Sequence, residues 1–246
     1  MDSTPKAVPA PNVRELVRSW LPFTWLVLLL LAARWTLVEP YVVPTGSMEP
    51  TLKTGDRLYA LKCAYDVRIP FTDVTLFRVS KVQRGDVILF RYPIDPDVTF
   101  VKRALAVEGD RVAMREGRLF INNQEVSKVA QSDRSLLYDI EYENDKTLFI
   151  EDLTGVHHWV ILDNVRPNAR DFPSPGRVPD GFVVEGDQVV IPEGKLLAVG
   201  DNRDNSSDGR SWGPVPMENL KGRAMFIWFS SWNWRVRPER IGTLIR

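Results

Sequence analysis

Cysteine and histidine are nearly absent from this chain of 246 residues, which contains one cysteine and two histidines. Cys63 therefore cannot form an internal disulfide, and the fold must depend on its core in any redox compartment. The two histidines, His157 and His158, are adjacent, and adjacent side chains of a β-strand point to opposite faces. They predict neither a metal site nor the histidine of a Ser-His-Asp triad, and we expect no metal and no cofactor.

An excess of charge is also missing, because 32 Lys and Arg residues balance 32 Asp and Glu residues. Proteins that bind nucleic acid usually carry a basic excess or stripe, so we do not expect nucleic acid as a partner. The stretch "DNSSDG" at 204–209 matches the opening of a calcium-binding loop, but Val215 stands where such a loop needs a bidentate Glu. We interpret this stretch as a cluster of turn residues.

One long apolar run is present, from Leu21 to Val38, and Arg34 is its one charged residue. Its 18 residues would span roughly 27 Å as a helix, close to the thickness of a hydrocarbon core. Trp20, Trp25 and Trp35 lie near its ends, as in an interfacial belt. A buried core helix is disfavoured because apolar residues cover all faces, and a cleaved signal peptide because no small-x-small site follows. We predict a transmembrane signal-anchor over 21–38.

The residues before this run predict its orientation. Lys6, Arg14 and Arg18 precede it, against Asp2 and Glu15. The positive-inside rule places residues 1–20 in the cytoplasm as a tail and everything after 38 outside. Ser47 lies nine residues past Val38, so an extended chain keeps it within roughly 30 Å of the bilayer.

Short apolar segments introduced by Gly-Asp dominate the rest: "TGDRLYAL", "RGDVILF", "EGDRVAM" and "EGDQVVI". Gly-Asp is turn chemistry, and the β-branched and aromatic residues that follow form strands. We expect a mostly β fold, a curled antiparallel sheet or partly closed β-barrel, with helical periodicity only in "MENLKG" outside the anchor. Residues 39–110 and 193–246 would form the catalytic domain, and the Asn- and Pro-rich stretch 111–192 an inserted β-rich lobe.

Aromatic residues are concentrated near the C-terminus: Phe226, Trp228, Phe229, Trp232 and Trp234. Strand alternation would bury about half of them. Two interpretations stay open for the tryptophans, since aromatic side chains suit both a core and a lipid interface.

Without a usable histidine, a serine paired with a lysine is the remaining route to nucleophilic catalysis. A lysine can act as a base if burial keeps it neutral. In "VTFVKRALAV", a strand would place Lys102 on one face with Phe100 and Ala104, and Arg103 on the other. Taken alone, this segment favours an edge-strand lysine that points to solvent, because buried lysines are rare.

Three segments change that balance because together they resemble the motifs of the bacterial type I signal peptidases (leader peptidases). "VPTGSMEPTL" resembles the nucleophile motif of this family, and "RGDVILFRYPIDPDVTFVKRALAVEGD" its lysine motif. "GDNRDNSSDGRSWGPVP", residues 200–216, resembles the third motif nearly letter for letter. Their order, anchor first, also fits, and three ordered motifs of this length are far more specific than a single short pattern.

The resemblance implies a role for each matching residue. Ser47 would be the nucleophile, Lys102 the general base, and Ser206 the hydroxyl that orients the lysine amine. Asp208 and Arg210 would brace this region. Thr45, where many relatives carry serine, would supply an oxyanion-hole hydroxyl beside the Ser47 N–H. Pockets for small substrate side chains would be shaped by Val43, Pro44, Met48, Leu52, Phe100 and Val101.

The resemblance thus implies a membrane-bound serine endopeptidase that removes signal peptides from exported preproteins after small residues, on the outer face of the bacterial cytoplasmic membrane. Its partners would be preprotein signal peptides, membrane lipid and, as a candidate, the protein-export machinery. Two alternatives remain: a self-cleaving repressor-type Ser-Lys protease, and a catalytically silent anchored β domain that scaffolds export partners.

Overall fold

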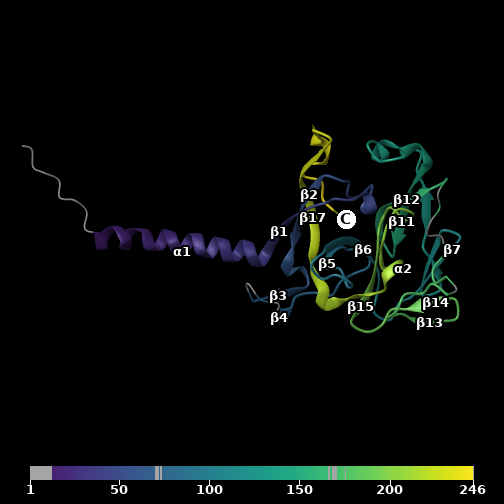
Figure 1. The fold of residues 1–246 in the computed structure, drawn as a ribbon, viewed down its shortest axis with the longest axis horizontal. Coiled ribbons are helices and arrows are strands. Elements are labelled where there is room, and N and C mark those ends of the chain that lie inside the picture. The colour runs from purple at the N-terminus through teal and green to yellow at the C-terminus, as the bar shows by residue number, and fades with distance from the viewer. Residues whose placement is uncertain are drawn as a thin grey trace, which may run out of the picture.

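A computed structural model describes residues 13–69, 72, 74–165, 167, 171–174 and 176–245. Within this range it omits the side chains at 13, 15, 32–36 and 68. The described chain forms one long N-terminal helix that projects from a body made mainly of β-strands (Figure 1). The mostly β fold predicted from the Gly-Asp segments is confirmed.

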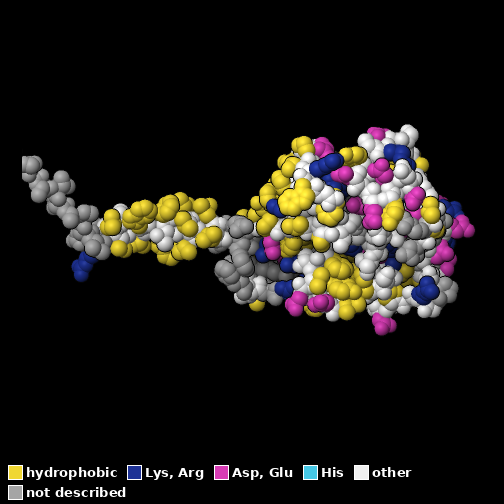
Figure 2. Space-filling model, turned by 45° about the horizontal axis from the view of Figure 1, so that its top comes forward, with side chains coloured by type: hydrophobic (Ala, Val, Ile, Leu, Met, Phe, Trp, Pro, Cys, Tyr) yellow, Lys and Arg dark blue, Asp and Glu magenta, His cyan; other side chains and the backbone are white. Residues whose placement is uncertain are grey.

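The long helix, α1, covers Val13–Leu37 and passes directly into the first strand. Apolar side chains cover its visible face (Figure 2), and residues such as Leu26 and Leu29 are exposed. Among the residues whose structure is described, no helix is both long and apolar enough to cross a membrane. Part of the predicted anchor 21–38, the side chains at 32–36, lies outside what the structure describes. Residues 1–12 of the predicted cytoplasmic tail lie outside it as well.

The main sheet has eight strands, with the order β1-β2-β17-β5-β6-β15-β16 and β18 paired to β17. Each pairing in it is antiparallel. The strands are β1 (Val38–Val42), β2 (Asp56–Leu61), β5 (Val87–Arg91), β6 (Thr99–Val107), β15 (Lys195–Val199), β16 (Val215–Pro216), β17 (Leu220–Trp232) and β18 (Arg235–Val236). β17 pairs with β5 over residues 220–223 and with β2 over residues 223–230, and the register shifts in both pairings curl the sheet.

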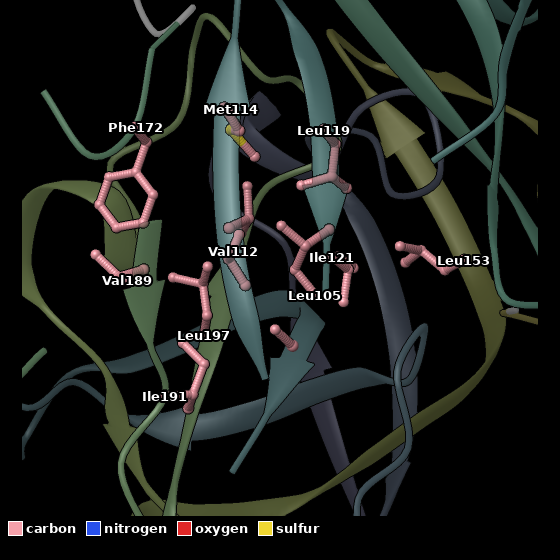
Figure 3. Packing of buried hydrophobic residues seen from close by; sticks show 12 residues of the cluster. Leu105, Val112, Met114, Leu119, Ile121, Leu153, Phe172, Val189, Ile191 and Leu197 are labelled. Carbon is pink, nitrogen blue, oxygen red and sulfur yellow. The ribbon is translucent and has the colours of Figure 1, made fainter. Parts of the chain in front are cut away.

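Two smaller sheets lie in the segment predicted as an inserted lobe. One contains β13 (Val183–Glu185), β14 (Gln188–Val190), β7 (Arg111–Arg115), β8 (Arg118–Ile121) and β9 (Gln124–Glu125), and the other β10 (Lys128–Ala130), β11 (Lys146–Leu153) and β12 (Val156–Asp163). Leu105 and Leu197 of the main sheet pack with Val112, Met114 and Ile121 of the five-stranded sheet in one buried cluster (Figure 3). Residues on both sides of positions 111 and 192 share this cluster. The predicted boundaries of the inserted lobe at these positions therefore stay predictions.

Short elements complete the fold. The hairpin β3 (Asp66–Arg68) and β4 (Thr75–Arg78) stands beside η2, and a four-residue helix α2 covers Gly209–Trp212. The 3-10 turns are η1 (Gly46–Met48), η2 (Lys62–Ala64), η3 (Ser135–Leu137), η4 (Glu143–Asp145), η5 (Met217–Asn219) and η6 (Pro238–Arg240). The helix expected at "MENLKG" is only η5, because Leu220 already begins β17.

The four Gly-Asp segments lead into strands as predicted, namely β2, β5, β7 and β14. Gly85 illustrates the reason, because its φ of 93° lies in the left-handed region that side chains disfavour. A Cβ there would also approach Val156 Cγ1 to 2.7 Å. The turn before β5 is therefore possible only with glycine.

The histidines and C-terminal aromatics divide between faces. His158 is buried beside Glu151, with 3.3 Å between Nε2 and Oε2, whereas His157 is exposed on the other face of β12. Along β17, Phe226 packs against the Tyr59 ring, but Trp228 and Trp232 are 36% and 44% exposed, and Trp234 is fully exposed. The tryptophans are thus available to an interface rather than buried in the core.

Candidate active site

Ser47 lies in the loop between β1 and β2, within the single 3-10 turn η1. Backbone hydrogen bonds close the base of this loop: Val43 N donates to Asp56 O at 2.8 Å, and Gly55 N donates to Val43 O at 2.9 Å. Ser47 is only 9% exposed. The Thr45 hydroxyl lies 3.5 Å from Ser47 Oγ at the rim of the same turn. The loop therefore holds the serine rigidly rather than presenting it on a mobile tip.

Lys102 reaches this serine from the interior of the main sheet. Its strand, β6, has β5 on one side and β15 on the other, so Lys102 does not lie on an edge strand. The side chain is buried, and its Nζ donates a hydrogen bond to Ser47 Oγ. Both faces of β6 are covered from Lys102 to Ala106, which explains why the solvent-facing interpretation of this segment is wrong.

Burial lowers the pKa of Lys102 to about 8, because the ammonium form loses its hydration. Asp208 and Asp201 oppose this shift, and Arg210 adds to it. Each carboxylate is already paired with an arginine: Arg103 Nη2 lies 2.7 Å from Asp201 Oδ2, and Arg210 Nη2 lies 2.7 Å from Asp208 Oδ2. The acidic residues near the lysine therefore do not supply a free counter-ion that would keep it charged.

The segment after β15 packs against the loop between β1 and β2 that carries Ser47. Gly200 comes so close that a Cβ there would lie 2.3 Å from both Ser47 O and Ser206 Oγ. Asp208 holds the turn together, because its carboxylate accepts from Gly200 N at 3.0 Å and from Arg210 N at 3.2 Å. Asp208 and Arg210, both predicted to brace this region, meet in one buried ion pair.

Ser206 Oγ is buried near Asp208, where its hydroxyl contributes to the lowered pKa of that carboxyl. The structure places it beside Gly200, next to the Ser47 backbone, and no hydrogen bond joins it to Lys102 Nζ.

A groove of about 490 Å³ opens over Ser47 and Lys102. Its walls are mainly apolar, and they come from the Ser47 loop and from strands β1, β2, β5 and β6. The lining residues are Tyr41, Val42, Val43, Pro44, Thr45, Gly46, Ser47, Leu58, Leu89, Val98, Thr99, Phe100, Val101, Lys102, Asn205 and Ser207. The groove is thus bounded by β1 and β6, and Ser47 and Lys102 form part of its lining.

Comparison with known proteins now identifies the family. The model of the family "Signal peptidase, peptidase S26" matches residues 15–229. The chain belongs to this family. Among curated relatives, signal peptidase I of Pseudomonas fluorescens is 37% identical over 89% of this chain and 74% of its own length. Signal peptidase I of Pseudomonas aeruginosa is 34% identical over the same shares, and that of Aquifex aeolicus 33% identical over 89% and 86%.

Membership of the signal peptidase family makes the chain an enzyme, a serine peptidase. A solved signal peptidase I from Enterococcus faecalis matches 59% of this chain and 97% of its own at 22% identity, with a TM-score of 0.37. Among the described residues, no group of three or more His, Cys, Asp or Glu side chains is arranged to hold a metal ion.

Four of the six residues predicted to shape the signal peptidase pockets line the groove: Val43, Pro44, Phe100 and Val101. The other two, Met48 and Leu52, are fully buried in the cluster below it. Met48 and Leu52 lie one turn apart, with Leu52 N donating to Met48 O at 2.9 Å, so both side chains face the core. Their contact with the loop supports Ser47 from beneath, so they shape the site without lining it.

Several polar residues of the site were not identified from the sequence as functional. Arg103 and Asp201 form a buried bidentate pair at 2.8 and 2.7 Å, and Glu49 and Asn202 lie buried behind the nucleophile. Each lies inside one of the three motifs that revealed the family. Their residue types alone gave no signal, because charged and amide side chains are usually exposed.

Proposed function

We propose that this chain is a membrane-anchored serine endopeptidase that removes N-terminal signal peptides from exported preproteins, with Ser47 as nucleophile and Lys102 as general base. The observation that carries the proposal is the hydrogen bond from Lys102 Nζ to Ser47 Oγ inside a buried site. A lysine in contact with a serine, and with its pKa lowered by burial, meets the two requirements for a base. The names of the relatives support the choice of substrate.

In this mechanism, neutral Lys102 accepts the hydroxyl proton as Ser47 Oγ attacks the carbonyl carbon of the scissile bond. The Ser47 N–H and the Thr45 hydroxyl donate to the resulting oxyanion, and Lys102 then gives its proton to the departing amine. Water repeats the sequence on the acyl-enzyme, with Lys102 again accepting and returning a proton. Ser206 would orient the lysine amine, and Asp208 with Arg210 would hold Ser206 in place.

The groove supports a preference for small residues on the acyl side of the cut. Val43, Pro44, Phe100 and Val101 contribute apolar walls to the groove. Apolar pockets discriminate by only about 1–3 kcal/mol per methylene, so exclusion of large side chains must come from the closed floor of the groove. Buried Met48 and Leu52 pack behind Val43, which lines the groove, and so support this floor from beneath.

We further propose that the segment 21–38 anchors the chain, with the N-terminus in the cytoplasm and the catalytic domain on the outer face of a bacterial cytoplasmic membrane. In support, α1 passes directly into β1, which leads to the nucleophile loop. Exposed Trp228, Trp232 and Trp234 would meet lipid at the interface, as amphipathic rings do. The protein-export machinery remains a candidate partner.

The direct test uses the full chain, solubilised in detergent, with a purified preprotein. Ser47→Ala and Lys102→Ala should each abolish cleavage, while Ser132→Ala and Lys81→Ala, at exposed positions, keep it. Circular dichroism verifies that each variant is folded. Full cleavage by either site variant would exclude the dyad. Cleavage of the chain itself alone would favour the repressor-type alternative, and a wild-type chain that binds but never cuts would favour the scaffold.

Anchoring needs its own measurement. The full chain should stay in the membrane fraction after an alkaline carbonate wash, because a spanning helix resists extraction where a peripheral protein does not. Protease added to the outer face should reach the catalytic domain and not the N-terminal tail. Release by carbonate, or digestion of the tail first, would contradict the proposed topology.

A further inference from the structure

Glu49 is a buried acid that the mechanism above does not use. It follows the nucleophile by two residues and is only 7% exposed. Its carboxylate covers Gly46, since a Cβ built on Gly46 would lie 2.6 Å from Glu49 Oε2. Lys53, Lys146 and Arg237 face it from a distance, and among the described residues none forms an ion pair with it. Burial consequently raises the pKa of Glu49 to about 7.

Among the described residues, Asn202 of the third motif is the one side chain that donates to this carboxylate, beside the backbone N–H of Thr54. Asn202 Nδ2 lies 3.4 Å from Glu49 Oε2 and 3.0 Å from Gly46 O. Both partners are acceptors, which identifies this end of the amide as the nitrogen. Asn202 also donates its backbone N–H to Ser47 O at 3.2 Å. One residue therefore holds two consecutive carbonyls of the nucleophile loop.

The Gly46 carbonyl shares a planar peptide unit with the Ser47 N–H. In a trans peptide these two groups point in opposite directions, so a fixed carbonyl also fixes the direction of the N–H. Gly46 O receives two donors, Asn202 Nδ2 and Glu49 N at 3.1 Å. Hydrogen bonds to the carbonyl also polarise the unit and strengthen its N–H as a donor.

We infer that Glu49 and Asn202 act together as positioning residues that aim the Ser47 N–H at the oxyanion. The Glu49 carboxylate orients the Asn202 side-chain amide, the amide holds Gly46 O, and the Gly46–Ser47 peptide then presents its N–H to the groove. This inference rests on the proposed function, because it needs the Ser47 N–H to serve as an oxyanion donor.

The test compares Glu49→Leu, which removes the acceptor, with Glu49→Gln, whose amide oxygen can still accept from Asn202. Three quantities are measured in detergent: kcat and KM on a signal-peptide substrate, the Kd of an uncleavable substrate peptide, and the Kd of a peptide boronate. The boronate forms a tetrahedral adduct with Ser47 and places an oxygen where the oxyanion develops. Glu125→Leu and Glu125→Gln, at an exposed position, are the matched controls.

We expect Glu49→Leu to lower kcat and the boronate affinity by about tenfold or more, since small misplacements of a catalytic group cost up to about a hundredfold. KM and the Kd of the uncleavable peptide should change by less than about twofold, because ground-state contacts remain. Glu49→Gln should stay within about threefold of wild type on all three. The double variant Glu49→Leu with Asn202→Ala should lose no more than the more impaired single variant, because both act through one amide.

Three results would overturn the inference: wild-type kcat in Glu49→Leu, equal losses in Glu49→Gln and Glu49→Leu, or equal losses of boronate and uncleavable peptide. If Glu49→Leu does not fold, Asn202→Ala must show the same selective loss of kcat and boronate affinity, and its absence refutes the inference. Failure of the proposed function looks different, because wild type would then neither cleave nor bind the boronate through Ser47.

Discussion

The pH dependence of cleavage gives the sharpest test of the Ser-Lys site. Burial lowers the pKa of Lys102 to about 8, against an ordinary value near 10.4. If the neutral amine is the base, about a tenth of the enzyme is active at pH 7 and about a hundredth at pH 6. We therefore expect kcat/KM to fall about tenfold per pH unit below pH 8 and to level off about one unit above it.

The assay is cleavage of a signal-peptide substrate that contains no titratable side chain, at fixed ionic strength and at substrate concentrations well below KM. Asp208→Asn supplies an internal check, because Asp208 raises the pKa of Lys102 and the freed Arg210 would lower it further. The acid limb should therefore move to lower pH in that variant, provided it is folded. A rate that stays flat down to pH 6, or a limb that does not move, would refute the assignment.

Three further predictions follow from the buried groups of the site. Lys102→Met should abolish cleavage but stabilise the fold at pH 7 by up to about 3 kcal/mol, since a pKa unit is worth about 1.4 kcal/mol. The reason is that the charged lysine destabilises the native state of the wild type below pH 8. Chemical denaturation should show that the gain in stability fades as the pH rises toward 10.5. Asp201→Asn should cost about 3–5 kcal/mol, because it leaves buried Arg103 without its partner, and thermal denaturation that matches wild type would contradict this. Gly200→Ala should lower kcat by about a hundredfold or more while the chain stays folded, since the added Cβ lies 2.3 Å from Ser47 O, and normal turnover would show that the contact relaxes freely.

The sequence predicted those parts of the fold that depend on local chemistry. Gly-Asp turns marked the starts of four strands because such turns need glycine at a positive φ, as Gly85 shows. The opposite faces of His157 and His158 followed from the period of a strand. Strand pairing could not be predicted in the same way, because β17 pairs with both β2 and β5 through contacts between residues more than a hundred positions apart.

The candidate site shows the same division. The segment around Lys102 taken alone predicted a lysine that points to solvent from an edge strand, and only the family resemblance predicted a buried one. The burial of Lys102 depends on β15, which pairs with β6 and lies some ninety residues further along the chain. Met48 and Leu52 were assigned to the pockets, because an apolar residue beside a nucleophile has the same sequence signature whether it lines a groove or supports one. Glu49 and Asn202 were not predicted to be functional, because each is the other's partner and they stand in separate motifs.

The segment that supports the nucleophile also connects it to the smaller sheets. Ile161 of β12 donates its N–H to Asp201 O at 3.0 Å and accepts from Arg203 N at 3.1 Å, so Asn202 is held between two backbone hydrogen bonds. Arg203 is fixed further by Glu151 of β11, with 3.1 Å between Nη1 and Oε1. The strands of the predicted insertion therefore brace the residue that holds the Ser47 loop. A change in β11 or β12 should reach the candidate site through Asn202, which gives this part of the chain a role in positioning Ser47.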